Sequence, residues 1–302
     1  MKYILRKVVL GKVPEIEITS EEYAKLKTAK NILSNALAIE ETYEIVIRGY
    51  IDFERQILDT ITIHMVRNPF DYKDFFEERL GLNIRLLNLL TACRLYIDKL
   101  PQNVRECIPN VSDSNEIVKK FRSKEYDGNK EYRFMEALRN YAQHRGIPVH
   151  WAQGCSRWTS LEDDGLMEYS IELASLRSKL EKDSEFKKEI LDEMEEKVDL
   201  IVATRSYIES LSNVHESVRI TIDESVTTAR KLIEGACSRY ASVNSGNVLG
   251  LSACKKSNCR LIDPIPLLLD WDDVRVKLQQ QNPKAINLKK RYVTGIIKTN
   301  NK

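Results

Sequence analysis

Apolar residues recur at every third or fourth position along most of this chain, the spacing that places side chains on one face of an α-helix. The pattern covers residues 20–66 with no proline and with Gly49 as the only glycine, so it predicts one very long helix or two helices bent at that glycine. It returns over residues 72–100, densely enough for burial on most sides, and Pro101 is expected to end that helix. A short helix is predicted over residues 112–121, with a polar loop after it.

The pattern changes after the middle of the chain. Two extended segments around a turn at Asp163-Asp164-Gly165 predict a β-hairpin, or a pair of extended arms, between residues 147 and 171. Helical spacing returns over residues 181–241, first as a charged run typical of a solvated helix surface, and a break is expected near residues 212–213. Residues 242–254 are small and polar, which predicts a linker.

These patterns together predict an all-α protein, a helical bundle with at most a small β-hairpin and a basic C-terminal segment. We divide the chain into a helical domain with the hairpin (1–180), a long helical region that completes the bundle or forms a dimer arm (181–245), and a linker with the basic segment (246–302). The first 14 residues predict an edge strand or an extended arm.

One helix is marked by clear start and stop signals. Residues 131–146 read EYRFMEALRNYAQHRG, with Asp127 and Asn129 before them as possible caps and with Gly146 and Pro148 as stop signals. At about 100° per residue, five side chains share an apolar face: Phe134, Met135, Leu138, Tyr141 and Ala142. The opposite face is formed by Glu136, Asn140 and Gln143.

Three residues of this helix are suited to phosphate chemistry. Arg139 stays charged and can bind two phosphate oxygens at once, whereas His144 can transfer a proton near neutrality. Both flank the polar face, and Asn140 between them could orient the imidazole or a phosphate. The alternative is a purely structural helix, in which Arg139 pairs with Glu136 one turn away and His144 only caps the C-terminus.

The order of arginine, polar residue, three residues and histidine resembles the signature of the HEPN superfamily, many of whose members are metal-independent ribonucleases. The resemblance covers roughly residues 19–146, although only the motif is sequence-specific. It implies an endoribonuclease with Arg139, Asn140 and His144 at the catalytic site, acting in phage defence or as a toxin with a possible antitoxin partner. A homodimer would double the catalytic set. Because many HEPN proteins are inactive, a non-catalytic helical adaptor or an RNA- or nucleotide-binding module is the alternative.

The chemistry of this motif favours attack of the ribose 2′-hydroxyl on the adjacent phosphate, which leaves a 2′,3′-cyclic phosphate. His144 would move the proton and Arg139 would stabilise the charge on the phosphorane. The sequence contains no glycine-rich phosphate loop, no HExxH and no paired Cys/His spacing, so no metal or cofactor is expected.

The composition indicates the class of protein and the cellular compartment. Of the 302 residues, 42% are hydrophobic and 30% are charged, which is typical of a globular protein with a substantial core. No apolar run approaches about 18 residues, so no membrane span is expected. The six cysteines have no framework spacing and no secretory signal is recognised, which favours reduced thiols in the cytoplasm. Cys155 lies near His150, but nothing in the sequence positions a base for it, so we do not expect a thiol nucleophile.

The charge is distributed unevenly along the chain. The net charge is only +2, but residues 254–302 hold eleven Lys and Arg against four Asp and Glu. This asymmetry predicts an RNA-binding segment, with Lys289, Lys290 and Arg291 as contacts to the phosphate backbone and with Tyr292 as a stacking face. An ordinary basic tail helix remains the alternative.

Overall fold

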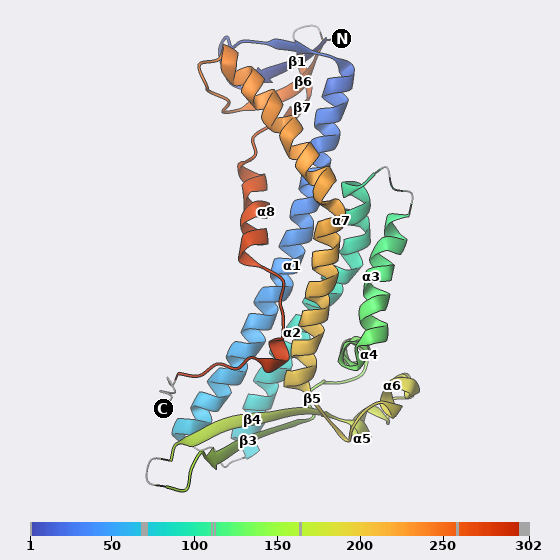
Figure 1. Cartoon of the computed structure of the whole chain (residues 1–302), viewed down its shortest axis with the longest axis vertical. Coiled ribbons are helices and arrows are strands. Elements are labelled where there is room, and N and C mark those ends of the chain that lie inside the picture. The colour runs from blue at the N-terminus through green and yellow to red at the C-terminus, as the bar shows by residue number, and fades with distance from the viewer. Residues whose placement is uncertain are drawn as a thin grey trace, which may run out of the picture. The chain divides into compact units, whose positions relative to one another are not determined.

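The computed structural model of the protein describes residues 2–67, 72–109, 111, 113–162, 165–257 and 260–295. The chain is 64% helical with two small antiparallel sheets, so the expectation of a mostly helical protein is confirmed. The helices in the described ranges are α1 (Ser20–Arg67), α2 (Tyr72–Cys107), α3 (Ser114–Gly128), α4 (Lys130–His144), α5 (Arg177–Leu180), α6 (Lys188–Asp192), α7 (Leu200–Val243), α8 (Asp270–Gln281) and the 3₁₀ turn η1 (Leu288–Lys290) (Figure 1). The strands are β1 (Lys2–Lys7), β2 (Ile16–Ile18), β3 (Trp151–Trp158), β4 (Met167–Leu176), β5 (Lys197–Asp199), β6 (Leu251–Ser257) and β7 (Arg260–Pro266).

The long helices are more continuous than predicted. Helix α1 passes Gly49 without interruption, and α2 contains Pro101 and continues to Cys107, so the predicted helix end at the proline is wrong. A proline inside a helix removes one backbone hydrogen bond. The turn that follows is stabilised instead by burial, since Val104 and Cys107 are fully buried and the Cys107 thiol lies 3.6 Å from the carbonyl oxygen of Ile32. Helix α3 also extends to Gly128, where a loop was predicted.

The charged run before α7 is not the continuous helix that the sequence predicted. It forms the short helix α6 and the three-residue strand β5, followed by α7 without the expected break near residue 212. Pairs of opposite charges stabilise a helix by only about 0.2–0.5 kcal/mol each, so the burial of apolar side chains decides the local fold. The buried side chains of this stretch are Leu180, Phe186, Ile190, Leu191 and Met194.

The predicted linker is mostly ordered structure. Helix α7 extends to Val243 and β6 begins at Leu251, which leaves a short turn between them. Gly246 and Gly250 in this turn adopt φ values of 80° and 76°, a conformation that glycine reaches without steric cost. The segment therefore returns the chain to a sheet rather than separating a basic tail.

The chain forms two compact units, each assembled from separate segments. Unit 1 comprises Met1–Ile45, Arg94–Phe121 and His215–Pro283, and unit 2 comprises Val46–Cys93, Arg122–Val214 and Lys284–Lys302. Helices α1, α2, α3 and α7 contribute to both units. The predicted division follows the chain order, whereas the compact units collect segments that are distant along it.

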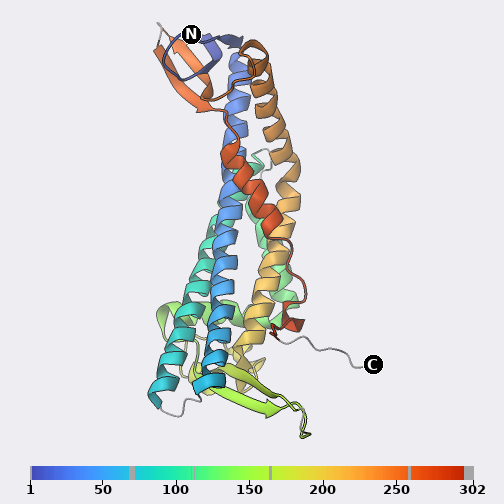
Figure 2. The same ribbon diagram turned by 90° about the vertical axis from the view of Figure 1, so that its left-hand side faces the viewer.

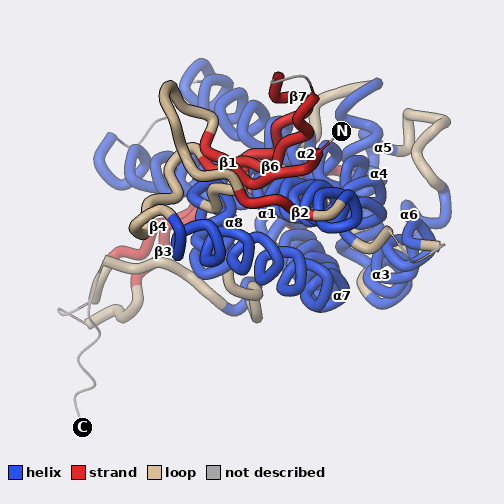
Figure 3. The backbone as a smooth tube through the Cα atoms, turned by 90° about the horizontal axis from the view of Figure 1, so that it is seen from above, coloured by secondary structure: helices blue, strands red, loops and turns tan. Residues whose placement is uncertain are grey.

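Unit 1 contains the four-stranded sheet, in which the strand order is β2-β1-β6-β7 and all neighbours are antiparallel (Figure 3). The N-terminal strand β1 therefore lies inside the sheet, with Ile4 opposite Cys254 and Leu5 opposite Ala253. These four residues are buried, which anchors the N-terminal and C-terminal parts of the chain in one core.

Unit 2 contains the three-stranded sheet β3-β4-β5, whose first two strands are the predicted hairpin. The hairpin lies across the C-terminal end of α1 (Figure 2). The His64 ring packs directly on Gly154 of β3. His64 also contacts the Glu78 carboxylate of α2 at 2.7 Å. The turn residues Asp163 and Asp164 lie outside the described residues.

Candidate functional site

Helix α4 carries the motif and is fixed at its first turn. Asn129 is the N-cap, and its side-chain oxygen accepts hydrogen bonds from the backbone N–H groups of Glu131 and Tyr132 at 3.1 and 3.2 Å. The amide nitrogen of Asn129 donates to Ser206 and Ser210 of α7 at 3.0 and 2.9 Å. The predicted cap is thus confirmed, and it also attaches α4 to α7 through a residue that a local pattern marks only as a helix start.

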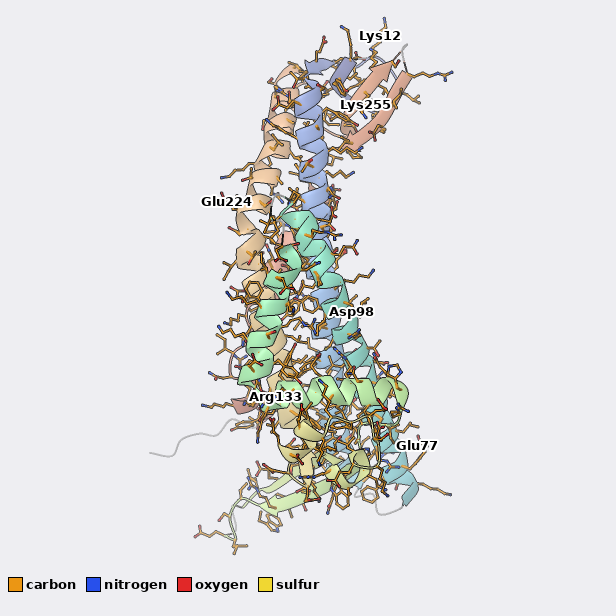
Figure 4. The ribbon with its side chains drawn as sticks, turned by 90° about the vertical axis from the view of Figure 1, so that its right-hand side faces the viewer. Lys12, Glu77, Asp98, Arg133, Glu224 and Lys255 are labelled. Carbon is orange, nitrogen blue, oxygen red and sulfur yellow. The ribbon has the colours of Figure 1, made fainter. Side chains whose placement is uncertain are left out.

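Arg133 makes a second attachment, to the chain before and after α4. Its guanidinium donates to the Glu193 carboxylate at 2.8 and 3.1 Å and to the carbonyl oxygens of Tyr126 and Asp127 at 2.6 and 3.0 Å. Figure 4 shows α4 from the side, with Arg133 near its N-terminal end. The N-terminal part of α4, which precedes the motif residues, is therefore fixed by hydrogen bonds to its surroundings.

Arg139 is buried, with only 3% of its surface exposed. Its Nη1 donates to Oε1 of Glu136 at 3.0 Å, and the Tyr207 hydroxyl of α7 donates to the same oxygen at 2.5 Å. Nη2 of Arg122 lies 3.8 Å from the second oxygen, Oε2. Only 12% of the Glu136 side chain is exposed, so the polar face of the helix is buried at this residue, and the pair with Arg139 is the one that the structural alternative named.

The surroundings of this ion pair are apolar enough to perturb other groups. Burial raises the pKa of the Tyr207 hydroxyl, and the negative charge of Glu136 raises it further. The same two causes raise the pKa values of Tyr132 and of the buried Cys93 thiol. These groups are consequently protonated at neutral pH, and none of them is a base or a nucleophile. The cluster has more donors than acceptors, because Nε of Arg139 and the Tyr132 hydroxyl are buried without a hydrogen-bond partner.

The other two motif residues lie at the surface. Asn140 and His144 are exposed, and in the described part of the chain neither side chain makes a hydrogen bond or an ion pair. His144 lies in the last turn of α4, as predicted. The structure therefore separates the motif: the guanidinium of Arg139 is in the core with Glu136, and the imidazole of His144 is in solvent.

His150 follows the motif helix but belongs to the packing of the hairpin. Its ring lies 6.1 Å from that of Tyr141, and its Nδ1 accepts the backbone N–H of Leu176 at 3.0 Å. Burial lowers the pKa of His150 to about 4, and the positive charges of Lys179 and Arg79 act in the same direction. A neutral ring with a lone pair on Nδ1 is what this hydrogen bond requires.

A polar pocket of 460 Å³ opens at the opposite end of α4. It is lined by the end of α3, the first turn of α4, one face of α7 and Lys289 of η1. Three lysines line it, namely Lys124, Lys130 and Lys289, and none has a carboxylate partner among the described residues. Three glutamates also line it: Glu125 accepts a hydrogen bond from Asn213, Glu209 accepts the backbone N–H of Leu288, and Glu131 is the third.

Helix α7 fixes the basic turn beside this pocket. Ser212 accepts the backbone N–H of Ala285 at 2.8 Å, and Arg205 donates to the carbonyl oxygen of Arg291 at 3.0 Å. Lys289, Lys290, Arg291 and Tyr292 are all exposed. The residues predicted to contact RNA are thus exposed, and hydrogen bonds attach their segment to α7.

Half of the other described basic residues of the C-terminal segment are in ion pairs. Lys255 pairs with Asp263, Lys256 with Glu15, and the buried Arg275 with Asp272, each in unit 1. Part of the charge asymmetry of the sequence is therefore used in ion pairs within unit 1. In unit 2, Lys284 and the turn at η1 are exposed and have no ion-pair partner among the described residues.

Sequence reasoning missed the two pocket lysines that precede and begin α4. Lys124 and Lys130 flank the Asn129 cap, and this nearness to a helix start was the only local signal. No local signal exists for Tyr207, which lies 71 residues from the carboxylate that it binds.

No model of a known protein family matches this chain, and neither does any curated protein or solved structure. In the described ranges, no helix is long and apolar enough to cross a membrane. The same ranges contain no group of three or more His, Cys, Asp or Glu residues that could hold a metal ion.

Proposed function

We propose that this protein is a non-catalytic helical module that binds RNA through the lysines of the polar pocket at the N-terminal end of α4. The observation that carries the first half of this proposal is the burial of Arg139 against Glu136. A catalytic arginine must reach the phosphate, and a guanidinium that is 3% exposed and bound to a carboxylate is not available for that contact.

Unpaired positive charge supports the second half of the proposal. Lys124, Lys130 and Lys289 line one pocket without ion-pair partners in the described chain, and Lys290 and Arg291 extend this charge along η1. Phosphate contacts of this kind provide most of the sequence-independent affinity for nucleic acid. The exposed Tyr292 offers a face on which an unpaired base can stack.

The test is binding of a fluorescein-labelled single-stranded RNA, measured by anisotropy over a range of salt concentrations. Replacing Lys124, Lys130 and Lys289 together by alanine should weaken binding and reduce the slope of log K against log salt by roughly 2, at about 0.7 for each phosphate that is no longer neutralised. The matched control replaces three exposed lysines away from the pocket, Lys73, Lys99 and Lys182, and should change the slope much less. Equal slopes for the two triple variants would contradict the proposed site.

A metal-independent endoribonuclease is the second candidate, and the exposure of His144 and Asn140 favours it. In that case His144 transfers the proton, while Arg139 leaves Glu136 to bind the phosphate, with Asn140 orienting the substrate. RNA would be cleaved to a 2′,3′-cyclic phosphate without added metal.

Incubation with total RNA in EDTA separates the two candidates. The binding module leaves the RNA intact, both as the native chain and as the His144→Ala variant. Cleavage by the native chain that disappears in the His144→Ala variant would establish the ribonuclease. The fold is checked by circular dichroism, because replacement of an exposed histidine should leave the helices unchanged.

A further inference from the structure

The sheet edges of this protein differ in how well they are protected. Natural sheets protect their edges with very short strands, prolines or charges, because an open edge pairs with another chain. In the described residues, β2 and β5 are only three residues long, and the edge strand β7 contains Pro264 and Pro266. Strand β3 is also an edge, yet it has eight residues, no proline and Arg157 as its single charge.

The register of the hairpin identifies which backbone groups of β3 point away from β4. Thr159 donates its N–H to the carbonyl oxygen of Leu166 at 2.8 Å, directly after the partners Trp158 and Met167. Bonded and unbonded positions alternate in an antiparallel pair. Four residues therefore direct their N–H and C=O groups to the open side of the sheet: Ala152, Gly154, Ser156 and Trp158.

We propose that a second copy of this chain occupies this edge, so that two β3 strands pair antiparallel about a two-fold axis and join the hairpins of two molecules into one sheet. The register that pairs all four outward residues with one another places Gly154 of one chain opposite Ser156 of the other and Ala152 opposite Trp158. Cys155 then lies on the axis opposite its own copy. An isologous contact of this kind closes after two molecules, so it forms a dimer rather than a fibre.

This register is compatible with the charges and apolar side chains of β3. Arg157 lies opposite Gln153 of the second copy, so no like charges meet. Trp158 lies opposite Ala152 of the second copy, on the face of the sheet that packs against His64. In the single chain Trp158 is 57% exposed, and its neighbour Met167 is 37% exposed. Pairing therefore covers an exposed aromatic side chain as well as the open backbone groups.

The proposed dimer does not depend on RNA binding. A disulfide between the Cys155 residues of the two copies would show the pairing directly. Opposite residues at unbonded positions have Cα atoms about 4.5 Å apart, a separation that a disulfide can bridge. Mild oxidation with diamide, which accepts the two electrons released by two thiols, should give a reducible species of twice the 35.0 kDa chain mass. Mass spectrometry should identify a Cys155–Cys155 peptide, and the Cys155→Ser variant should lack it. Absence of that peptide from the oxidised native chain would overturn the proposal.

A pair of variants tests the register. In Gln153→Cys/Cys155→Ser, the two new thiols lie about 14 Å apart along the strands and should not form a disulfide. Adding Arg157→Cys places a thiol opposite the one introduced at position 153 of the other copy and should restore cross-linking. Cross-linking of the first variant as efficiently as the second would contradict the register.

The last arm tests assembly without oxidation. Ser156 is exposed and its N–H points outward, so Ser156→Pro removes a dimer donor and leaves the bonds to β4 in place. In reducing buffer, analytical ultracentrifugation should show a concentration-dependent dimer for the native chain and for Ser156→Thr, and a monomer for Ser156→Pro. Equal melting temperatures of the two variants would show that the fold persists. A native chain that is monomeric throughout, or a dimer that Ser156→Pro leaves unchanged, would overturn the proposal.

Discussion

The Arg139 guanidinium donates to the carboxylate of Glu136 at 3.0 Å, one turn away on α4, and this pair lies in the core of unit 2. The hydroxyl of Tyr207 donates a second hydrogen bond to the same carboxylate oxygen. A buried charge is tolerated only when it is paired and hydrogen-bonded. The motif arginine is thereby committed to the stability of the fold, which is why we favour binding over catalysis.

The first prediction concerns this pair. Arg139→Ala leaves Glu136 as a buried charge without its main partner, and we expect the free energy of unfolding to fall by about 3–5 kcal/mol. Urea denaturation followed by circular dichroism measures it. His144→Ala and Asn140→Ala, both at exposed positions, should remain within about 0.5 kcal/mol of the native protein. A small loss for Arg139→Ala, similar to that of the two controls, would show that the ion pair contributes little.

Local periodicity predicted the features that depend on local interactions. The long helices, the Asn129 cap of α4 and the hairpin follow from helical spacing, from a side chain that accepts backbone N–H groups, and from extended segments around a turn. The exposed basic turn at Lys289 was also identifiable, because its charges are adjacent in sequence.

Features that depend on distant packing were not predictable in this way. Pro101 remains inside α2 because the following turn is buried, and the charged run before α7 breaks because its scattered apolar residues enter the core. The helical wheel placed Glu136 on the polar face, but nothing near it in sequence indicates that Tyr207 and Arg122 lie against its carboxylate. The expected site of Arg139, Asn140 and His144 could not be checked from the sequence for the same reason. The spacing of Arg139 matches the motif, but its burial depends on residues that are distant along the chain.

The second prediction concerns a buried network in unit 1. Glu40 is 1% exposed and accepts hydrogen bonds from Arg219 at 2.6 and 2.9 Å, while His215 lies 3.2 Å away and accepts the Tyr96 hydroxyl at its other nitrogen. Burial acts to raise the pKa of Glu40, but the hydrogen bonds from His215 and Arg219 outweigh it and hold it at about 2. Glu40 is therefore ionised at neutral pH.

Removing Glu40 alone should lower the free energy of unfolding more than removing both Glu40 and Arg219. Glu40→Ala leaves the Arg219 charge with only the carboxylate of Glu216, at 4.0 Å, and we expect it to lower the free energy of unfolding by about 3–5 kcal/mol. Glu40→Met/Arg219→Met removes both charges and retains volume, so it should cost less than Glu40→Ala. Urea denaturation of the three proteins measures this difference. A double variant less stable than Glu40→Ala would mean that the ion pair itself, rather than the isolated charge, determines the loss.

The third prediction is that the free energy of unfolding depends on pH through His150. The folded protein holds the pKa of this imidazole near 4, whereas an unfolded histidine titrates near 6.5. Between these values the unfolded chain binds more protons, so the free energy of unfolding should fall as the pH is lowered from about 6.5 to about 4. Denaturation curves over this window should show a smaller decline for His150→Gln, whose amide can still accept the Leu176 N–H. Parallel declines in the two proteins would assign the acid sensitivity to other groups.

The fourth prediction concerns the contact between the hairpin and α1. A Cβ at Gly154 would lie 1.9 Å from Nδ1 of His64, far inside any tolerated contact, so Gly154→Ala must displace either β3 or the imidazole. The imidazole is held on its other side by Glu78 at 2.7 Å, which makes that displacement costly. We expect a loss of about 1–3 kcal/mol in the free energy of unfolding.

A double-mutant cycle shows whether the clash is the cause. In a His64→Ala background the obstacle is gone, so adding Gly154→Ala should cost little, and the coupling between the two sites should be about 0.5–3 kcal/mol. Gly235→Ala is the control for the intrinsic effect of replacing glycine, because nothing lies within 4 Å of its Cβ position in α7, and it should stabilise the protein by about 0.5–1 kcal/mol. If Gly154→Ala costs the same with and without His64, the strand itself requires glycine, and the histidine is not the reason for it.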